Sequence, residues 1–300
     1  MATPHLDALK RDGFVVVRNL LTPTEVSHYR EIATKATTLT RTGSWPHFRT
    51  VPKQFPPWPT THLMHPEMPG RESFARCYFS PTILAVAEEL MGIENTDSET
   101  EPLVMELFNL LVAPETKDFE LRWHRDDISE HATAEEELAQ LAAKAPGGRQ
   151  SHCQYNLALC PDASLIVVPG THARARTQVE READPYAAEL PDQLVVQLQP
   201  GDAVFYNSNI LHRGVYRGKS EGGPETRLTL HGSLGLKASG DGGDAEEKKK
   251  VRATAVLQHG VGAWVNRDDA AFGLGERAER MRANLVEMGT GEGVGFSLQG

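Results

Sequence analysis

The chain has 300 residues, 39% of them hydrophobic, which is enough to bury a core in one large domain or two small ones. Lys and Arg number 31 against 41 Asp and Glu, and the net charge of −10 argues against binding to a nucleic-acid backbone. Its three cysteines, Cys77, Cys153 and Cys160, are too few and too scattered for a disulfide framework, so we expect a reducing compartment.

Helices and one long loop are predicted for the first hundred residues. Thr22 precedes Pro23 and is followed by Glu25, the pattern of a capped helix start with proline in the first turn. Residues 43–70 hold seven prolines among aromatic residues, which predicts a surface loop or the wall of an active site. In order, we expect a short helix before residue 13, a strand at 14–17, a helix at about 23–37, this loop, and a helix at about 81–91.

The remainder of the chain is richer in strands. Turn residues separate β-branched and aromatic runs at 104–112, 154–159, 165–168, 194–198, 203–206 and 227–234. Two helices are expected at 133–144 and about 277–288, and the polar, glycine-rich stretch 239–250 is predicted to be a loop. We therefore predict a single, mainly β domain over residues 1–300, with helices packed at its N-terminal side.

The most informative motif is His124-Arg125-Asp126. In a strand, residues i and i+2 point to the same face, so His124 and Asp126 can offer a nitrogen and an oxygen to one metal ion. His212 lies 86 residues later, after a turn and an apolar strand, and is the candidate third ligand. Two histidines and one carboxylate on one side of a metal leave three positions open, which suits iron(II) with a keto acid and dioxygen.

A keto acid such as 2-oxoglutarate also needs a cation for its distal carboxylate, and Arg227 is the candidate. A planar guanidinium can hold a carboxylate through two parallel hydrogen bonds. Arg227 begins a predicted strand 15 residues after His212, and the intervening 218–226 resembles a hairpin loop that would pair this strand with the His212 strand. An arginine on the surface of an edge strand is the alternative interpretation.

Four motifs in this order resemble the phytanoyl-CoA dioxygenase family of non-heme iron oxygenases. They are the opening 12–17 with 20–26, the 124–126 motif, Val167-Val168-Pro169-Gly170-Thr171-His172, and Gly201-Asp202 ahead of His212 and Arg227. The resemblance implies a double-stranded β-helix, the cupin-like jelly-roll, at about 100–236. Helices and the proline-rich loop would form 1–99, with a C-terminal helix at about 277–288. It also implies iron(II), 2-oxoglutarate and dioxygen as cofactors and cosubstrates.

Further site residues follow from position in the family. Asn109 lies on the strand that borders the cosubstrate, Asn156 lies where the family often has a cosubstrate-lining residue, and Gln154 shares the strand face of Asn156. The sequence departs from the family at Gly214, where a serine is frequent two residues after the second histidine. One hydrogen bond to the cosubstrate is therefore missing or supplied by another residue. An insertion at 128–152 adjoins the ligands and could shape the substrate entrance.

The substrate is less constrained than the metal. Candidate pocket groups are Trp45, Phe48, Arg49 and Arg122, and Trp58 lies in the same loop as the first three. Asp126 argues against a halogenase, which needs that position for halide. We favour hydroxylation, desaturation or oxidative cyclisation of a small natural product. An acyl-CoA hydroxylase and a cupin-like metal-binding protein that does not use 2-oxoglutarate are the alternatives.

The compartment is predicted from what the sequence lacks. Residues 1–13 have no apolar core of a signal peptide, and no run of about 18 apolar residues occurs. We therefore expect a cytoplasmic enzyme with a small-molecule partner and no nucleic-acid or membrane partner. A homodimer is compatible with the sequence.

Overall fold

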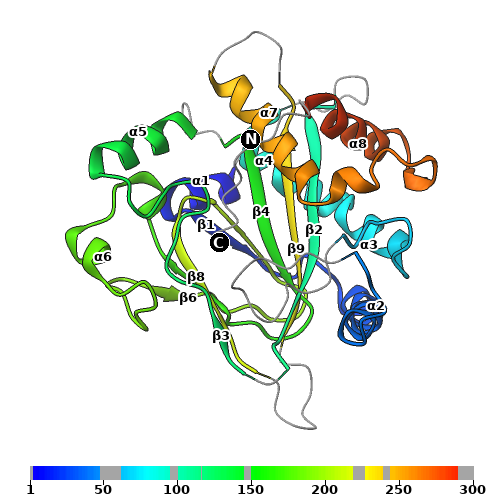
Figure 1. The fold of residues 1–300 in the computed structure, drawn as a ribbon, viewed down its shortest axis with the longest axis horizontal. Coiled ribbons are helices and arrows are strands. Elements are labelled where there is room, and N and C mark those ends of the chain that lie inside the picture. Colours follow the sequence, from blue (N-terminus) through cyan, green and yellow to red (C-terminus); the bar gives the residue numbers. More distant parts are fainter. Residues whose placement is uncertain are drawn as a thin grey trace.

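Two antiparallel β-sheets form the centre of the protein (Figure 1). The computed structural model describes residues 3–47, 62–94, 101–115, 117–144, 150–218, 227–238 and 244–289. The first sheet has the order β1-β7-β4-β9-β2 and the second β3-β8-β5-β6, and every strand pair in them is antiparallel. The strands are β1 (Phe14–Val17), β2 (Leu103–Val112), β3 (Phe119–Glu120), β4 (His152–Ala158), β5 (Leu165–Val168), β6 (Leu194–Val195), β7 (Ala203–Tyr206), β8 (Leu211–Tyr216) and β9 (Leu228–Leu236).

Helices cover the outer face of the first sheet and flank the second. They are α1 (Pro4–Asp12), α2 (Pro23–Arg41), α3 (Arg71–Tyr78), α4 (Pro81–Met91), α5 (Ala134–Lys144), α6 (Gln178–Glu182), α7 (Asp244–Gln258) and α8 (Glu276–Met288). Figure 1 shows α2, α3 and α8 on the side of β2, and α5 and α6 beside the second sheet. This arrangement is the jelly-roll with flanking helices that the sequence predicted.

Strand β4 shows how the sequence builds this architecture. Cys153, Tyr155 and Leu157 alternate along the strand and belong to the main apolar core, which β4 shares with the helices. Because successive side chains point to opposite faces, Gln154 and Asn156 face the other way, into the space between the sheets. At one end that space is closed by a smaller apolar cluster with residues from both sheets, including β4, β5 and β7.

Several predicted elements have the expected bounds. The side chain of Thr22 accepts a hydrogen bond from the backbone of Glu25, whose own side chain accepts from the backbone of Thr22, and α2 begins at Pro23 as predicted. It continues to Arg41, further than the sequence suggested. Helix α4 matches its predicted range.

Two predictions about local structure were wrong, and one helix was not foreseen. The loop expected at 239–250 is helical from Asp244 onward, because its alanine, glutamate and lysine residues favour helix and Arg252 anchors α7 to Glu106. Helix α3 was not foreseen, and the strand expected at 194–198 is regular only at Leu194–Val195.

The largest correction concerns β8 and β9, which were expected to form a hairpin. Strand β8 pairs with β3 and β5, whereas β9 pairs with β2 and β4 in the opposite sheet. Chain connections that cross between sheets are usual in a jelly-roll, and local sequence does not distinguish such a crossover from a hairpin. Arg227 therefore faces β8 across the interior of the fold.

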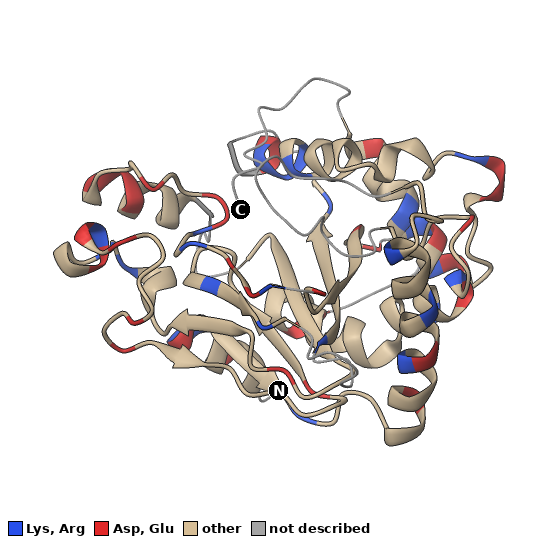
Figure 2. Ribbon diagram, turned by 60° about the horizontal axis from the view of Figure 1, so that its bottom comes forward, with Lys and Arg blue, Asp and Glu red and all other residues tan. Residues whose placement is uncertain are grey.

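The surface carries charges of both signs. Figure 2 shows Lys and Arg interleaved with Asp and Glu along the helices. Within the part of the chain that the structure describes, no helix combines the length and the apolar character needed to cross a membrane.

Candidate metal centre

A single β-bridge brings the two histidines together across 88 residues of chain. His124 and His212 exchange two backbone hydrogen bonds of 3.0 Å, and their rings are 4.4 Å apart between centroids. The sequence pattern predicted that His124 and Asp126 lie in a strand, but the structure has no regular strand there. Instead, the backbone N–H of Asp126 donates to the carbonyl of Ser208 at 2.8 Å, which directs the carboxylate to the same place.

The Pro169-Gly170-Thr171-His172 turn fixes the start of β8, the strand that carries His212. The hydroxyl of Thr171 donates to the carbonyl of Val168 at 2.7 Å and accepts from the backbone N–H of Leu211 at 2.8 Å. Leu211 directly precedes His212, so a buried threonine fixes the start of the strand that carries this histidine. His172 lies away from the ligands, with its Nε2 3.2 Å from the carbonyl of Lys10.

The donor atoms of the three side chains converge. Oδ1 of Asp126 is 3.4 Å from Nε2 of His124 and 3.6 Å from Nε2 of His212. Metal ligands at about 2.0–2.2 Å from a common ion lie roughly 3 Å apart or slightly more. Each Nδ1 donates to a backbone carbonyl, that of Arg122 at 2.8 Å or of Ile210 at 2.9 Å. Both Nε2 lone pairs are thereby left for a metal, so the residues present fit an iron(II) ion.

Electrostatics keep the donors in the protonation states that a metal requires. Burial raises the pKa of Asp126, but His212, His124 and the hydrogen bond from Gln154 outweigh it and hold this pKa below its usual range. Burial, with the neighbouring His124, lowers the pKa of His212 to about 4. At neutral pH the site therefore offers an ionised carboxylate and a neutral imidazole.

Gln154 bonds the carboxylate of Asp126, and the adjacent Asp127 bonds the loop before β8. The Nε2 of Gln154 donates to Oδ2 of Asp126 at 2.8 Å, so this predicted cosubstrate residue contacts the carboxylate of a candidate metal ligand. Asp127, which sequence reasoning missed, accepts hydrogen bonds from Ser208 at 3.1 Å and Asn209 at 3.2 Å. These contacts fix the loop before β8 against the segment that carries His124 and Asp126.

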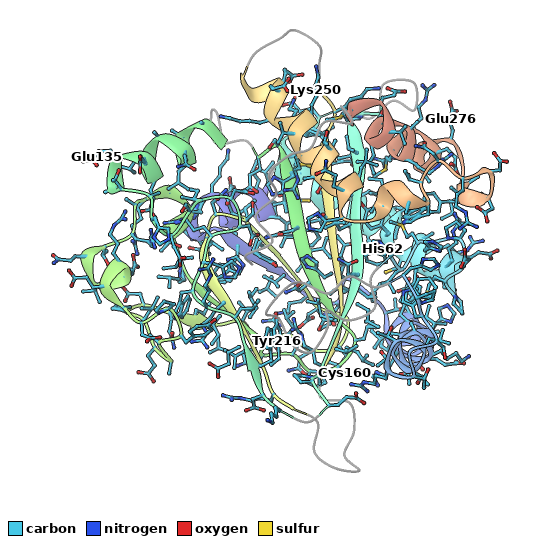
Figure 3. All side chains as sticks on the ribbon, viewed as in Figure 1. His62, Glu135, Cys160, Tyr216, Lys250 and Glu276 are labelled. Atoms are coloured by element: carbon cyan, nitrogen blue, oxygen red, sulfur yellow. The ribbon has the colours of Figure 1, made fainter. Side chains whose placement is uncertain are left out.

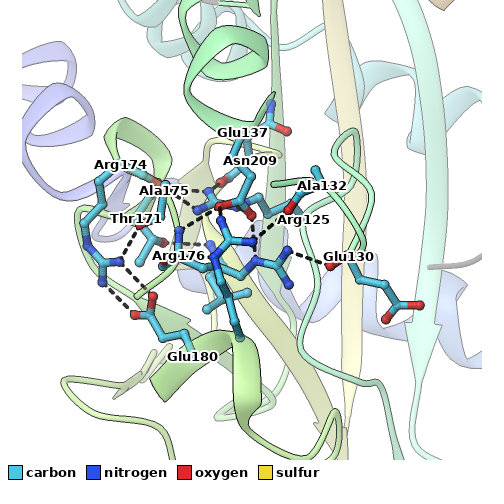
Figure 4. Close-up of polar contacts among 12 residues, drawn as sticks. Arg125, Glu130, Ala132, Glu137, Thr171, Arg174, Ala175, Arg176, Glu180 and Asn209 are labelled. Carbon is cyan, nitrogen blue, oxygen red and sulfur yellow. Dashed lines mark hydrogen bonds and ion pairs between the residues drawn. The ribbon is translucent and has the colours of Figure 1, made fainter. Parts of the chain in front are cut away.

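Arg125 anchors this segment to α5, the inserted helix (Figure 4). Its guanidinium donates to the carbonyls of Thr171, Asn209 and Arg174, at 2.7 Å for the first and 2.9 Å for the last. Its Nε lies 3.7 Å from the carboxylate of Glu137, a residue of α5 with no exposed surface. The insertion is thus joined directly to the middle residue of the metal-binding motif, where the sequence had suggested only proximity.

Asn109, His231 and Asn156 form a row across three neighbouring strands. Asn109 on β2 is opposite His231 on β9, which is opposite Asn156 on β4. Nδ1 of His231 lies 2.9 Å from Oδ1 of Asn156. Burial lowers the pKa of His231, the charge of Asp126 opposes this shift, and that of Arg227 adds to it. His231 was missed in the sequence, although the alternation of polar and apolar residues along 227–233 could have indicated it.

Arg227 is buried between the sheets, with 4% of its surface exposed. Its Nε donates to Asp162 at 3.1 Å, and its Cζ lies 4.3 Å from the ring centroid of Tyr216 on β8. Within the described residues, neither terminal nitrogen of Arg227 has a hydrogen-bond partner. The guanidinium therefore has one edge available for a carboxylate, while Asp162 provides a counter-charge for its other side.

The four candidate substrate residues are distributed differently. Phe48 and Arg49 lie outside the described residues, as does Trp58. Trp45 is buried and packs edge-on against His47 and His65, with ring centroids 5.0 and 5.5 Å away. Arg122 forms an ion pair with Glu130, and its carbonyl orients His124.

His47, His65 and Glu67 form a second cluster with the composition of a metal site. However, Nδ1 of His65 accepts a hydrogen bond from the backbone N–H of Glu67 at 3.1 Å, which leaves the ring proton on Nε2. The carboxylate of Glu67 is engaged by Arg267 at 2.8 Å and by His47 at 3.0 Å. This hydrogen bonding differs from that at His124 and His212 and does not favour a metal ion.

Comparisons with known proteins match this chain to one family and to several solved structures. The family model described as phytanoyl-CoA dioxygenase matches residues 9–215. Similar solved structures include EctD from S. alaskensis with 2-oxoglutarate and 5-hydroxyectoine, which has a TM-score of 0.54, is 17% identical and covers 78% of this chain and 76% of its own. AviO1 from Streptomyces viridochromogenes Tue57 has a TM-score of 0.51 and 17% sequence identity, and the match covers 77% of this chain and 93% of AviO1. SnoN, the non-heme alpha ketoglutarate dependent epimerase from nogalamycin biosynthesis, has a TM-score of 0.50 and 18% sequence identity. The match covers 81% of this chain and 91% of SnoN. No curated protein matches significantly.

Proposed function

This chain belongs to the phytanoyl-CoA dioxygenase family, and from that premise we propose that it oxidises a small polar molecule, with iron(II) held by His124, Asp126 and His212. Iron(II) and 2-oxoglutarate are the cofactors of this class of oxygenase. When bound, they would activate dioxygen, which is the oxidant for both the substrate and 2-oxoglutarate, and the latter would leave as succinate and carbon dioxide. The protein holds the metal, orients the cosubstrate through Arg227 and shields the reacting groups from water.

The observation that carries the proposal is the hydrogen bonding of the three ligands. Both histidines have Nδ1 committed to a carbonyl, and Asp126 has one oxygen bonded by Gln154 and the other near both Nε2 atoms. Such an arrangement leaves three inward-facing donors for one ion and no need for a fourth protein ligand.

A polar substrate is supported by the side chains that adjoin the metal centre. Along the inner faces of β4 and β9 these are His152, Gln154, Asn156, His231 and Ser233. At one end, Arg252 of α7 forms two hydrogen bonds of 2.7 Å with the buried carboxylate of Glu106. These groups already bond one another or neighbouring residues, and a fatty acyl chain could not satisfy the hydrogen-bonding capacity that remains to them. The acyl-CoA alternative is therefore disfavoured.

The test is an anaerobic titration with iron(II), followed by 2-oxoglutarate. We expect the weak visible charge-transfer band of a chelated keto acid in the wild type and in His131→Ala, whose imidazole is 87% exposed. His212→Ala should give no band, because it removes one of the three ligands. Iron binding without a band in the wild type would favour the cupin-like alternative.

The substrate class has its own readout. Succinate released from 2-oxoglutarate should increase with members of a panel of hydroxyl- and amino-bearing small molecules and not with saturated acyl-CoA thioesters. Stimulation by an acyl-CoA alone would overturn the proposal of a polar substrate while leaving the oxygenase assignment in place.

A further inference from the structure

Gly214 and Tyr216 on β8 pack so closely that the Tyr216 side chain fills the space beside Gly214. Residues His212, Gly214 and Tyr216 alternate along the strand and therefore share a face. A Cβ atom added to Gly214 would lie 2.3 Å from the hydroxyl oxygen of Tyr216 and 2.5 Å from its Cζ. The tyrosine ring thus folds back along β8, and its hydroxyl occupies the space that a side chain at position 214 would fill.

The same ring forms one side of the space around Arg227. The Cζ of Arg227 is 4.3 Å from the Tyr216 ring centroid, and Phe119 on the neighbouring strand stacks against this ring at 5.7 Å with an interplanar angle of 5°. Tyr216 is one of the labelled side chains in Figure 3. In the part of the chain that the structure describes, the Tyr216 hydroxyl has no hydrogen-bond partner, and neither do the terminal nitrogens of Arg227.

The Tyr216 hydroxyl, four residues after His212 on the same face of β8, and the free edge of the Arg227 guanidinium together form a site for a carboxylate. Here we propose that Tyr216 donates a hydrogen bond to the distal carboxylate of 2-oxoglutarate, beside Arg227, and that Gly214 is glycine because it must leave room for that hydroxyl. This inference rests on the proposed use of 2-oxoglutarate. It deepens that function by assigning a cosubstrate-binding residue specific to this chain.

The chemistry of Tyr216 suits the donor role. Burial raises the pKa of its hydroxyl above the ordinary value, so it remains protonated and able to donate at neutral pH. Stacking on Phe119 and contact with Arg227 hold the ring in one orientation, so little conformational freedom is lost when the carboxylate binds. A hydroxyl on a rigid ring can therefore replace one carried by a short side chain at position 214.

The experiment compares two tyrosines changed in the same way. Tyr216→Phe removes only the proposed donor. Tyr155→Phe removes a buried hydroxyl that also lacks a partner among the described residues but lies on the opposite face of β4, in the main apolar core. Both proteins are titrated anaerobically with 2-oxoglutarate in the presence of iron(II), and Kd is read from the charge-transfer band. Thermal unfolding verifies that each variant is folded.

Tyr216→Phe should raise Kd for 2-oxoglutarate by about 10- to 100-fold, the range for one hydrogen bond to a charged group. Tyr155→Phe should leave Kd unchanged. The effect of Tyr216→Phe should vanish with 2-oxobutyrate, which retains the chelating oxo acid but lacks the distal carboxylate. An unchanged Kd for 2-oxoglutarate in Tyr216→Phe would overturn the inference, as would equal weakening of both keto acids.

A reciprocal change tests the coupling with Gly214. Gly214→Ser alone should weaken 2-oxoglutarate binding, because the new side chain collides with Tyr216. Combined with Tyr216→Ala, the serine gains space and a hydroxyl near the same carboxylate, so the double variant should bind more tightly than Tyr216→Ala alone. A double variant no better than Tyr216→Ala contradicts the exchange of hydroxyls. A wild type with bound iron and no band refutes the proposed function itself.

Discussion

Glu137→Ala should be among the most destabilising single substitutions in this protein. The carboxylate of Glu137 has no exposed surface and receives hydrogen bonds from Nε of Arg176 at 2.6 Å, from Nη2 of Arg181 at 2.5 Å and from the backbone N–H of Arg176 at 2.8 Å. Arg125 is a third cationic neighbour, and only 2% of its side chain is exposed. Removing the carboxylate would leave these cations without their shared anion (Figure 4).

The expected loss in the free energy of unfolding is about 3–5 kcal/mol, the usual cost of removing one partner from a buried ion pair. Arg181 can recover part of its hydration because 25% of its side chain is exposed, whereas Arg125 cannot. Since whole domains are stable by about 5–15 kcal/mol, this loss would be a large fraction of the total. Burial lowers the pKa of Arg125 to about 10 although the charge of Glu137 opposes this shift, so removing Glu137 would lower the pKa further.

Urea denaturation measures this effect, with Glu135→Ala as the control. Glu135 lies in the first turn of the same helix and is exposed, so its replacement should change stability by less than about 0.5 kcal/mol. The denaturation midpoint of Glu137→Ala should fall at an unchanged slope. If Glu137→Ala and Glu135→Ala lost equal stability, the three arginines would not depend on Glu137 and the reasoning would be refuted.

Two further outcomes follow from the site. Gln154→Leu should weaken iron(II) binding by about 10- to 100-fold through loss of the hydrogen bond to Asp126, whereas Gln178→Leu on the exposed α6 should not, as measured by metal titration. Burial lowers the pKa of His231 from 6.5 to about 4, so the unfolded chain binds this proton first and stability falls as pH decreases from about 6.5 to 4. His231→Asn should reduce that slope by at most about 1.4 kcal/mol per pH unit in urea unfolding at a series of pH values, and an unchanged slope would contradict the shift.

The sequence could indicate the candidate metal ligands because residue type and order restrict them strongly. A His-x-Asp pair, a later histidine and an arginine beyond it suggest an iron and keto-acid site without any knowledge of which strands pair. The β-bridge between His124 and His212 and the crossover that separates β8 from β9 are contacts between distant segments. Local periodicity carries no information about such pairing, and for this reason the predicted hairpin was wrong.

The residues that were missed depend on a neighbour in space. His231 becomes significant only when register places it opposite Asn156, and Tyr216 only when the missing side chain of Gly214 admits its hydroxyl. Glu137 is one of three consecutive glutamates in the first turn of α5, and composition does not distinguish the one that meets three arginines. In each case the role of the residue depends on a second residue that is distant in the sequence or has no distinctive chemistry of its own.

Strand register orders the interior of the site along β4 and β9. The pair Gln154 and Ser233 lies at the level of the candidate metal ligands, because Gln154 bonds Asp126. The next inward pair is Asn156 and His231, about 7 Å further along at the rise of a β-strand. Arg227 lies beyond it, immediately before β9. A 2-oxoglutarate molecule held between the candidate metal ligands and Arg227 would pass the Asn156 and His231 pair, so we expect these two side chains to face the cosubstrate and Gln154 to support Asp126.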